Sequence, residues 1–404
     1  MYKTLIVPLP VSIISIASLS PLGNSAEGVW ESYINNSSLI KNITVGNKVV
    51  PAAILPLELQ KEVSDLAKSD TKYTHLDSSV LYAIVASRAA VKNAGWQAGD
   101  NFGINIGSSR GATQLFEEHY REYLETGKSR VQASPSTTLG NISSWVAQDL
   151  KTSGPDVSHS VTRSTALHAV LNGVAWLRAG MADKFLVGGS EAPVTSFTIA
   201  QMQAMKIYSA LNDEYPCRAF DLDKKTNTMV LGEGSAAACM ELGRKSNALA
   251  FIEGIGYSTE MLQHSASISA DAECLQRSMM MALQDCDTNE IDAIVMHTPG
   301  TLKGDLSEYN AIQKLFGDAI PLLTTNKWKI GHTLGASGLL SLEMAILMLM
   351  HQRFIGVPYL DENGFLDKPL RKILINAAGF GGNAVSVLLS KNENPELKSG
   401  VASN

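Results

Sequence analysis

The sequence is poor in charge and contains no cluster of basic residues. Only 18% of the 404 residues are charged, and 33 Lys and Arg against 39 Asp and Glu give a net charge of −6. Without a basic run there is no electrostatic footprint for a phosphate backbone, which argues against a nucleic-acid-binding role. The hydrophobic content of 45% is typical of a globular protein and excludes disorder for the bulk of the chain.

Cysteine is scarce, and its spacing indicates neither a disulfide framework nor a metal site. None of the cysteines forms a CxxC pair or a zinc-ligand spacing. A chain of this length buries ample core without cross-links, so we expect a reducing, cytoplasmic compartment. No metal, nucleotide or flavin motif occurs, and we expect no cofactor of these kinds. The four cysteines are Cys217, Cys239, Cys274 and Cys286.

Long hydrophobic runs are also absent. The apolar stretch 339–350 is too short to span a bilayer and contains Glu343, which predicts a buried helix and no membrane span. Lys3 and the apolar residues after it resemble a secretory signal, but prolines interrupt them and no small-x-small cleavage site follows. A buried strand over 11–17 with a turn at 21–24 fits better.

Strand-like and helical segments alternate along the chain. A helix over 79–94 is predicted to begin at a cap, Asp77 or Ser78, and to end at Gly95. A second helix is predicted over 164–179, with Gly180 as its end. This alternation predicts an α/β fold with helices packed over sheets. Strands are expected at 103–106, 184–187, 291–296, 373–375 and 385–389.

A faint internal repeat indicates two related halves. In each half a glycine-rich bend, at 232–234 and at 381–383, leads into an apolar terminal strand. A new strand, 250–255, opens the second half. We therefore predict an N-terminal half over residues 1–245, a C-terminal half over 246–391 and a flexible tail over 392–404.

Four motifs could carry chemistry, and each also has a purely structural interpretation. His297 follows a buried strand, where it could donate a hydrogen bond or could be a satisfied core histidine. His332 lies at the start of a small-residue helix, which favours its neutral ring. Phe380 is flanked by glycines that could let its ring swing or simply let the chain turn. The segment 161–168 predicts a sharp turn that presents one side chain at a helix N-terminus.

In order and spacing these motifs resemble the β-ketoacyl synthases, the condensing enzymes of fatty-acid and polyketide synthesis. The resemblance runs from about Val11 to Leu389 and includes the segments 218–221 and 232–234. It implies the thiolase fold, with duplicated βαβαβαββ halves in a five-layered α/β arrangement. It also implies substrates that arrive on the phosphopantetheine arm of an acyl carrier protein.

The resemblance assigns expected roles to individual residues. His297 and His332 match the two histidines that stabilise the enolate formed when a malonyl unit loses carbon dioxide. Lys327, five residues before His332, matches the lysine that supports this site. Phe380 matches the phenylalanine that gates the acyl and malonyl pockets, and Thr301 matches a threonine that holds the phosphopantetheine arm.

The nucleophile of the family does not carry over. The family cysteine lies five residues before a helical histidine, and five residues before His168 stands Arg163. A guanidinium stays protonated and cannot attack a thioester. Because burying its charge is costly, we expect a carboxylate or a cluster of carbonyls around it. Ser164 is a less favoured replacement, since one step along a helix turns the side chain by about 100°.

Three further departures accompany this change. Pro299 replaces another threonine that grips the phosphopantetheine arm. Ser341 occupies the place of a glutamate nine residues after His332, although Glu343 is near. Residues 224–227 replace an Arg-Asp-Gly-Phe turn, with two residues more.

A ketosynthase-like chain without its nucleophile resembles the chain-length-factor subunits of type II polyketide systems, with the variant subunits of aryl polyene pathways the nearest likeness. The resemblance implies a heterodimer with an active ketosynthase, whose acyl tunnel this chain would shape, and visits by an acyl carrier protein. We expect the interface at strand 184–187, with Trp176 in reach of the partner and a docking patch at Lys368, Arg371 and Lys372 or on the partner. The alternative is a malonyl-carrier-protein decarboxylase that makes starter units, since enolate stabilisation needs donors and no thiolate.

Overall fold

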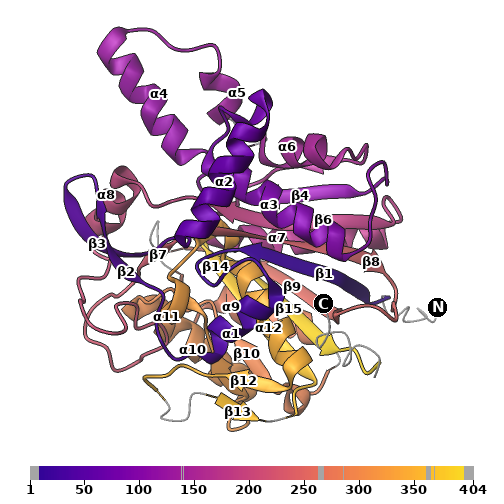
Figure 1. Cartoon of the computed structure of the whole chain (residues 1–404). Helices are drawn as coiled ribbons and strands as arrows, with labels where there is room; N and C mark the ends of the chain where they lie inside the picture. Colours follow the sequence, from indigo (N-terminus) through magenta and orange to yellow (C-terminus); the bar gives the residue numbers. More distant parts are fainter. Residues whose placement is uncertain are drawn as a thin grey trace.

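Two mixed β-sheets form the centre of the molecule (Figure 1). The computed structural model describes residues 9–137, 139, 141–262, 268–284, 286–360, 365–367 and 369–394. The first sheet has five strands in the order β1-β8-β6-β4-β5, and the second has five in the order β9-β15-β14-β10-β11. The strands of the first sheet are β1 (Val11–Leu19), β8 (Gly234–Leu242), β6 (Lys184–Glu191), β4 (Gly103–Gly107) and β5 (Asp156–Val157). Those of the second are β9 (Ala250–Thr259), β15 (Asn383–Lys391), β14 (Lys372–Gly379), β10 (Ala293–Val295) and β11 (Leu322–Thr324).

The two sheets match strand for strand. In each, the first three strands pair antiparallel and the last three pair parallel. Most of these strands are apolar throughout because both of their faces are covered. In β10, for example, Ala293 and Val295 belong to the core between the sheets, while Ile294 belongs to the core on the outer face.

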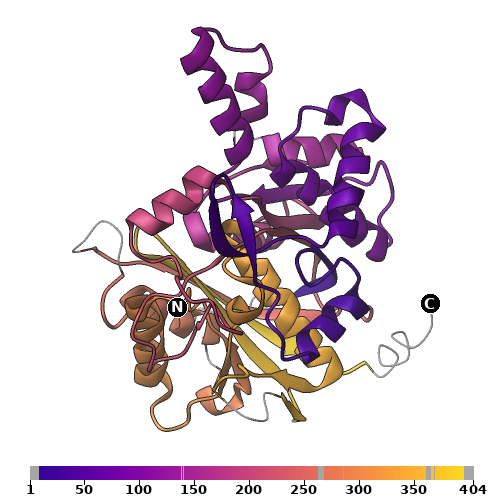
Figure 2. The same cartoon turned by 60° about the vertical axis from the view of Figure 1, so that its left-hand side comes forward.

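Helices cover both sheets and also separate them. α7 (Thr165–Arg178) and α12 (Ser337–His351) pack between the two sheets, where they contact strands of both. α3 (Ser78–Asn93) and α6 (Asn141–Leu150) cover the outer face of the first sheet. α9 (Glu273–Leu283) and α10 (Leu302–Phe316) cover the outer face of the second. The views in Figures 1 and 2 agree on this layering.

The central helix α12 is apolar on all sides because both sheets surround it. In the described part of the chain, 334–351 is one stretch long and apolar enough to cross a membrane, and 89% of it is buried inside the protein. The buried helix predicted from the sequence is therefore present as a core helix.

Local capping signals were predicted well. Asp77 is the N-cap of α3, where its carboxylate accepts a hydrogen bond from the Ser79 N–H. Gly95 follows α3 and Gly180 follows α7, with φ of +70° and +67°, the left-handed conformation that glycine adopts without strain. The strands at 184–187, 373–375 and 385–389 are present but longer than predicted.

The predicted interface strand does not lie at a sheet edge. β6 pairs with β8 on one side and with β4 on the other, so its backbone is already satisfied. The alternation of strands and helices does not reveal strand order, which is why the prediction for 184–187 was wrong. The exposed edge on that side of the sheet belongs to β5, which pairs with β4 alone in the part of the chain described. Trp176 instead packs its ring against Phe185 of the same chain.

A helical hairpin projects from the body of the molecule. It consists of α4 (Thr113–Thr126) and α5 (Ala133–Thr137) and stands clear of the sheets in both views (Figures 1 and 2). A small sheet, in the order β2-β3-β7, lies near its base. The remaining elements are α1 (Ala26–Ile34), β2 (Lys41–Val45), β3 (Lys48–Ala53), α2 (Leu57–Ser69), α8 (Ser196–Ala204), β7 (Leu231–Gly232), α11 (Lys327–Ile330), β12 (Arg353–Ile355) and β13 (Phe365–Asp367).

The start of the predicted tail is attached to the body. The side-chain amide of Asn392 donates to the carbonyls of Ser246 and Ala248, and that of Asn394 donates to Ser246. The remainder of the tail, 395–404, lies outside the described residues.

Candidate active site

The predicted sharp turn is a single 3-10 turn, η2 (Thr162–Ser164), placed directly before α7. Thr162 has φ +49°, a strained value for a β-branched residue. The end of β14 approaches this turn so closely that a Cβ on Gly379 would lie 2.3 Å from the Thr162 Oγ1 atom. Only glycine fits there. The turn thus presents Arg163 to the space between β14 and the loop before α12.

Arg163 is buried without a counter-ion. Its side chain is only 8% exposed, and its Nε atom has no hydrogen-bond partner among the described residues. Burial lowers the guanidinium pKa to about 10, so the group is still charged at neutral pH. The expected carboxylate or carbonyl cluster is absent from the described surroundings. Instead the guanidinium carbon lies 3.8 Å from the ring centroid of Phe380, a cation–π contact.

His297 and His332 lie side by side, with ring centroids 5.2 Å apart and planes at 76°. The Nδ1 atom of His332 accepts a hydrogen bond of 3.2 Å from the Leu334 N–H, which assigns the proton of the neutral ring to Nε2. That Nε2–H has no acceptor among the described residues. It is therefore a donor available to a substrate.

Both histidine rings are neutral at pH 7. Burial lowers the pKa of His297 well below its ordinary value, and the positive charges of Lys327 and Arg163 lower it further. Burial also lowers the pKa of His332, with smaller contributions from His297, Arg163 and Lys327. The neutral ring of His332 agrees with the prediction, but burial is the main cause, since a 3-10 turn separates His332 from α12.

Lys327 is buried beside the histidines and has no carboxylate bonded to its ammonium in the described structure. Its Nζ atom lies 3.4 Å from the Ser341 Oγ atom. Burial lowers the pKa of Lys327 to about 8, while the negative charge of Glu308 opposes this shift. Glu343 does not substitute for the missing glutamate, because two residues along a helix turn its side chain by about 200° from Ser341.

Glu308 was missed by the sequence analysis. Its carboxylate accepts hydrogen bonds from the backbone N–H groups of His297 (2.9 Å) and Thr298 (2.7 Å). It thereby fixes the loop that carries the histidine. Asp305 and Glu308 are three residues apart and face the same side of α10. The position of Glu308 on the buried face of α10, three residues after Asp305, is the signal that could have identified it.

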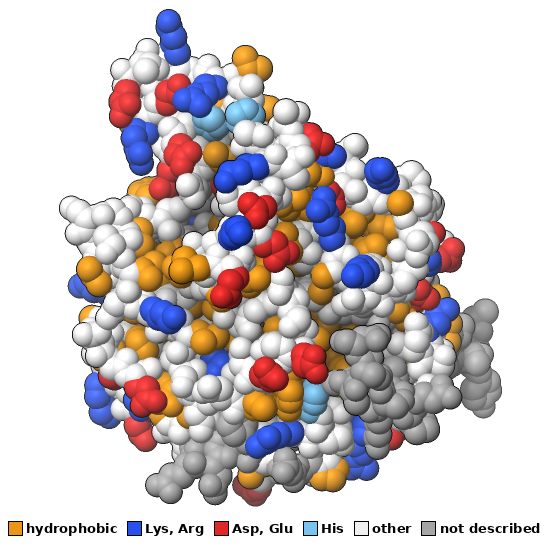
Figure 3. Space-filling view, in the orientation of Figure 1, with side chains coloured by type: hydrophobic (Ala, Val, Ile, Leu, Met, Phe, Trp, Pro, Cys, Tyr) orange, Lys and Arg blue, Asp and Glu red, His pale blue; other side chains and the backbone are white. Residues whose placement is uncertain are grey.

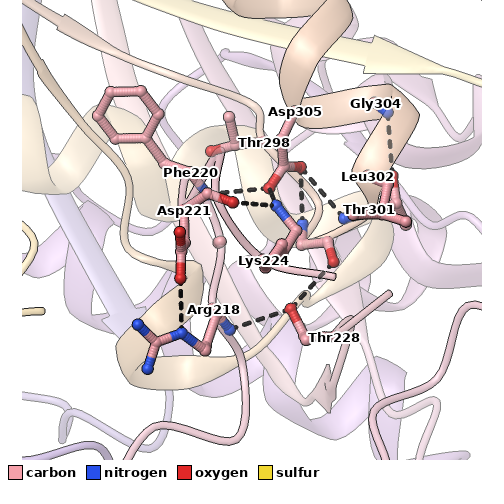
Figure 4. Close-up of polar contacts among 12 residues, drawn as sticks. Arg218, Phe220, Asp221, Lys224, Thr228, Thr298, Thr301, Leu302, Gly304 and Asp305 are labelled. Atoms are coloured by element: carbon pink, nitrogen blue, oxygen red, sulfur yellow. Dashed lines mark hydrogen bonds and ion pairs between the residues drawn. The ribbon is translucent and has the colours of Figure 1, made fainter. Parts of the chain in front are cut away.

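Asp305 anchors the loops around the site through a buried ion pair (Figure 4). Its carboxylate lies 2.7 Å from the Lys224 Nζ atom and accepts the N–H groups of Phe220, Gly300 and Thr301. Lys224 is the first residue of the segment 224–227, which stands where the resemblance implies an Arg-Asp-Gly-Phe turn. The lysine therefore holds this segment against the first turn of α10.

Thr301 and Pro299 lie in the loop between β10 and α10. The Thr301 hydroxyl oxygen caps α10 by accepting a hydrogen bond of 3.2 Å from the Gly304 N–H. Pro299 packs against the same turn, since a Cβ on Gly304 would lie 3.0 Å from its Cγ atom. These contacts are structural, and the expected role of the two residues in binding a phosphopantetheine arm stays a prediction.

No other side chain of the turn is set up as a nucleophile. The Ser164 hydroxyl lies 2.6 Å from the Asn383 Oδ1 atom and 2.9 Å from the Val161 carbonyl, and neither is a base. Burial raises the thiol pKa of three cysteines to about 12, which makes them unreactive. They are Cys217, Cys239 and Cys274.

Comparison with known proteins identifies the family. The model of the β-ketoacyl synthase N-terminal domain matches residues 9–246, and that of the C-terminal domain matches residues 249–358. The chain belongs to the β-ketoacyl synthase family. Among its relatives is 3-oxoacyl-[acyl-carrier-protein] synthase 2 of Staphylococcus aureus (strain N315), 28% identical over 95% of this chain and 98% of that protein. The synthase of the same name from Coxiella burnetii is 27% identical over 94% of this chain and 98% of that protein.

Solved structures establish the ketosynthase fold, an α/β thiolase-like fold with mixed sheets. The ishigamide ketosynthase/chain length factor superposes with a TM-score of 0.81 at 20% identity, covering 95% of this chain and 99% of that chain. A type II polyketide ketosynthase, solved with its acyl-carrier protein and bound to the hexaketide, gives a TM-score of 0.82 at 19% identity, covering 95% and 100%.

Proposed function

We propose that this β-ketoacyl synthase is a chain-length-factor-like subunit. It would pair with an active ketosynthase in bacterial fatty-acid or polyketide synthesis of the aryl polyene type. In this heterodimer it would support the decarboxylative Claisen condensation and line the acyl tunnel without taking the acyl group itself. The observation that carries the proposal is Arg163 in the turn directly before α7, at the position where the resemblance implies the family cysteine.

A charged, stacked guanidinium cannot perform the covalent step. Nucleophilic catalysis needs a lone pair at the attacking atom, and Arg163, whose pKa burial lowers to about 10, is protonated at neutral pH. The ring of Phe380, expected to act as the gate, is held against this charge. A condensing enzyme with an atypical nucleophile is the weaker alternative, because Ser164 has no base bonded to its hydroxyl.

Two features of the surface support a partner of the same family. The two-residue strand β5 lies at the edge of the first sheet, beside which a second sheet could pack, although the Val157 carbonyl already accepts hydrogen bonds from the Asn105 and Ser143 side chains. The projecting α4 carries exposed apolar side chains, among them Phe116 and Leu124, which are 60% and 65% exposed. Exposed apolar patches of this kind mark interaction sites. One structural neighbour, the ishigamide ketosynthase/chain length factor, is by its name such a pair.

The other expected properties belong to the same proposal. The matching strand orders of the two sheets support duplicated βαβαβαββ halves in five layers, with the boundary at 245/246. An acyl carrier protein would deliver the substrates, and the complex would reside in the cytoplasm. Of the suggested docking patch, Lys368 lies outside the described residues and Lys372 pairs with Glu290, which weakens this patch as a docking site.

A second candidate function is decarboxylation of a malonyl carrier protein. The Nε2–H of His332, which has no acceptor among the described residues and lies beside His297, favours this function, because the two histidines could stabilise an enolate oxygen. Carbon dioxide release from malonyl carrier protein that is abolished by His297→Ala would support this function, and no release above background would exclude it.

Copurification tests the partner role directly. Expressed with the ketosynthases of its host, the chain should copurify with a cysteine-bearing homologue, and the pair should condense acyl and malonyl units. Replacing the cysteine of the partner by alanine should abolish condensation, while Ser164→Ala in this chain should leave it unchanged. A stable homodimer of this chain that condenses by itself would refute the proposal.

A further inference from the structure

Among the described residues, Arg163 carries a buried positive charge without a counter-ion. The hydrogen bonds and ion pairs of three buried carboxylates go to groups other than Arg163: Glu308 binds two backbone N–H groups, Asp305 pairs with Lys224, and the Oε1 atom of Glu191 accepts N–H groups from the Ser109 and Gly335 backbones. None of them forms an ion pair with Arg163 in the described structure, and no charged group offsets the effect of burial on its guanidinium. An isolated buried cation of this kind is costly unless an anion accompanies it.

Two buried N–H donors around Arg163 and His332 have no acceptor in the described structure. The Nε–H of Arg163 and the Nε2–H of His332 have no acceptor among the described residues. The turn that carries Arg163 packs against the 3-10 turn Leu334–Ala336, which begins two residues after His332, and the charge of Arg163 depresses the pKa of the His332 ring. An acceptor placed at the guanidinium would therefore lie in the same cluster as the histidine donor.

The contact with Phe380 restricts how a ligand can approach. The guanidinium carbon lies over the aromatic ring, 3.8 Å from its centroid, so a ligand must reach the N–H donors from a side that the ring does not occupy. A carboxylate matches the planar edge of N–H donors with two parallel hydrogen bonds, whereas a spherical chloride ion does not.

We propose that Arg163 forms a carboxylate-binding site, with His332 as a flanking donor. The ligand is a planar carboxylate, either a free small carboxylate ion or the carboxylate of a malonyl-type group on a carrier thioester. Binding of the free ion follows from the described residues alone. Binding of the thioester-borne carboxylate rests in addition on the proposed function.

Acetate and chloride, compared at equal ionic strength, test the site. The protein is used as purified, with any partner that accompanies it, and its thermal unfolding is followed at neutral pH. We expect acetate to raise Tm by roughly 1–3 °C over chloride. Arg163→Met keeps the apolar stem on Phe380 and removes the charge, so it should abolish this rise. Arg163→Lys keeps the charge but lacks the planar edge of N–H donors, so it should reduce the rise in Tm. Arg277→Met, at an exposed position, is the matched control and should show the same rise in Tm as the unaltered protein.

Carrier proteins loaded with malonyl or acetyl groups distinguish the two sources of carboxylate. The malonyl form should bind at least about tenfold tighter than the acetyl form, and Arg163→Met should remove the difference. Acetate stabilisation without any binding of carrier protein would keep the site and count against the proposed function. If acetate stabilises the unaltered protein no more than chloride does, the site is refuted, whatever the variants do.

Discussion

At the residue scale, the site combines a buried charge with two neutral rings. Arg163 keeps its charge against the ring of Phe380, at the position where the resemblance implies an attacking group, while His297 and His332 have neutral rings at close range. Burial explains both the neutral histidine rings and the charged arginine. It disfavours the charged form of every one of these groups, but it cannot deprotonate an arginine at neutral pH. Among the described residues, the site therefore has a hydrogen-bond donor in the His332 Nε2–H group and no hydroxyl bonded to a base in the turn that carries Arg163.

The buried histidines predict a loss of stability at acidic pH. The unfolded chain protonates each histidine near pH 6.5, whereas the folded chain does so only well below this value. The contribution of the two neutral histidines to the free energy of unfolding is therefore fully present above about pH 6.5 and is lost as the pH falls below this value. At pH 5.5, each histidine that stays neutral in the folded protein should lower the free energy of unfolding by about 1.4 kcal/mol. Acidic groups with a raised pKa act in the opposite sense, so variants must be compared.

His332→Asn should reduce the difference in unfolding free energy between pH 7.5 and pH 5.5 by about 1.3 kcal/mol. Chemical denaturation at the two pH values measures this difference. The exposed His75→Asn is the control and should leave the difference unchanged. An unchanged difference in His332→Asn would show that the ring titrates normally in the folded protein.

At the element scale, the sequence predicted which segments are helices and strands better than it predicted where they lie. Asp77, Gly95 and Gly180 gave local boundaries because capping depends on neighbouring residues alone. The order of strands depends on distant pairing, which explains why β6 was wrongly expected at an edge. The contact of Arg163 with Phe380 joins segments more than 200 residues apart, and no local pattern encodes it.

The loops around α10 depend on one buried ion pair. Asp305→Asn leaves the ammonium of Lys224 buried without a counter-charge, and we expect a loss of about 3–5 kcal/mol in unfolding free energy. Asp271→Asn removes the partner of Lys314 in an exposed pair and should cost less than about 0.5 kcal/mol. Equal effects in the two variants, measured by denaturant titration, would contradict the anchoring role.

At the scale of the whole molecule, the surface favours assembly through shape and apolar contact. In the face shown in Figure 3, basic and acidic side chains are interspersed without a large patch of one sign. This agrees with the low charge of the sequence. The projecting hairpin, by contrast, exposes aromatic side chains: Phe116, Tyr120 and Tyr123 are 60%, 54% and 51% exposed. The order and spacing of motifs predicted the site residues by resemblance, whereas no motif in the sequence predicted the exposed surface of this hairpin.

Substituting exposed residues of the hairpin should weaken assembly without affecting the fold. Phe116 and Tyr120 stack on α4 and are 60% and 54% exposed, so the double change Phe116→Ser, Tyr120→Ser should leave Tm nearly unchanged. The amount of copurified partner should fall roughly tenfold. Leu57→Ser, at an 81% exposed position on α2, is the matched control. Equal copurification of all three proteins would exclude the hairpin from the interface.

Acyl loading tests the central claim most directly. The complex of this chain with its partner is incubated with acyl carrier protein bearing an acyl chain, and each polypeptide is then weighed intact by mass spectrometry. We predict that the added acyl mass is found only on the partner and that this chain keeps its unmodified mass. An acyl adduct on this chain, at Ser164 or any other residue, would contradict the account.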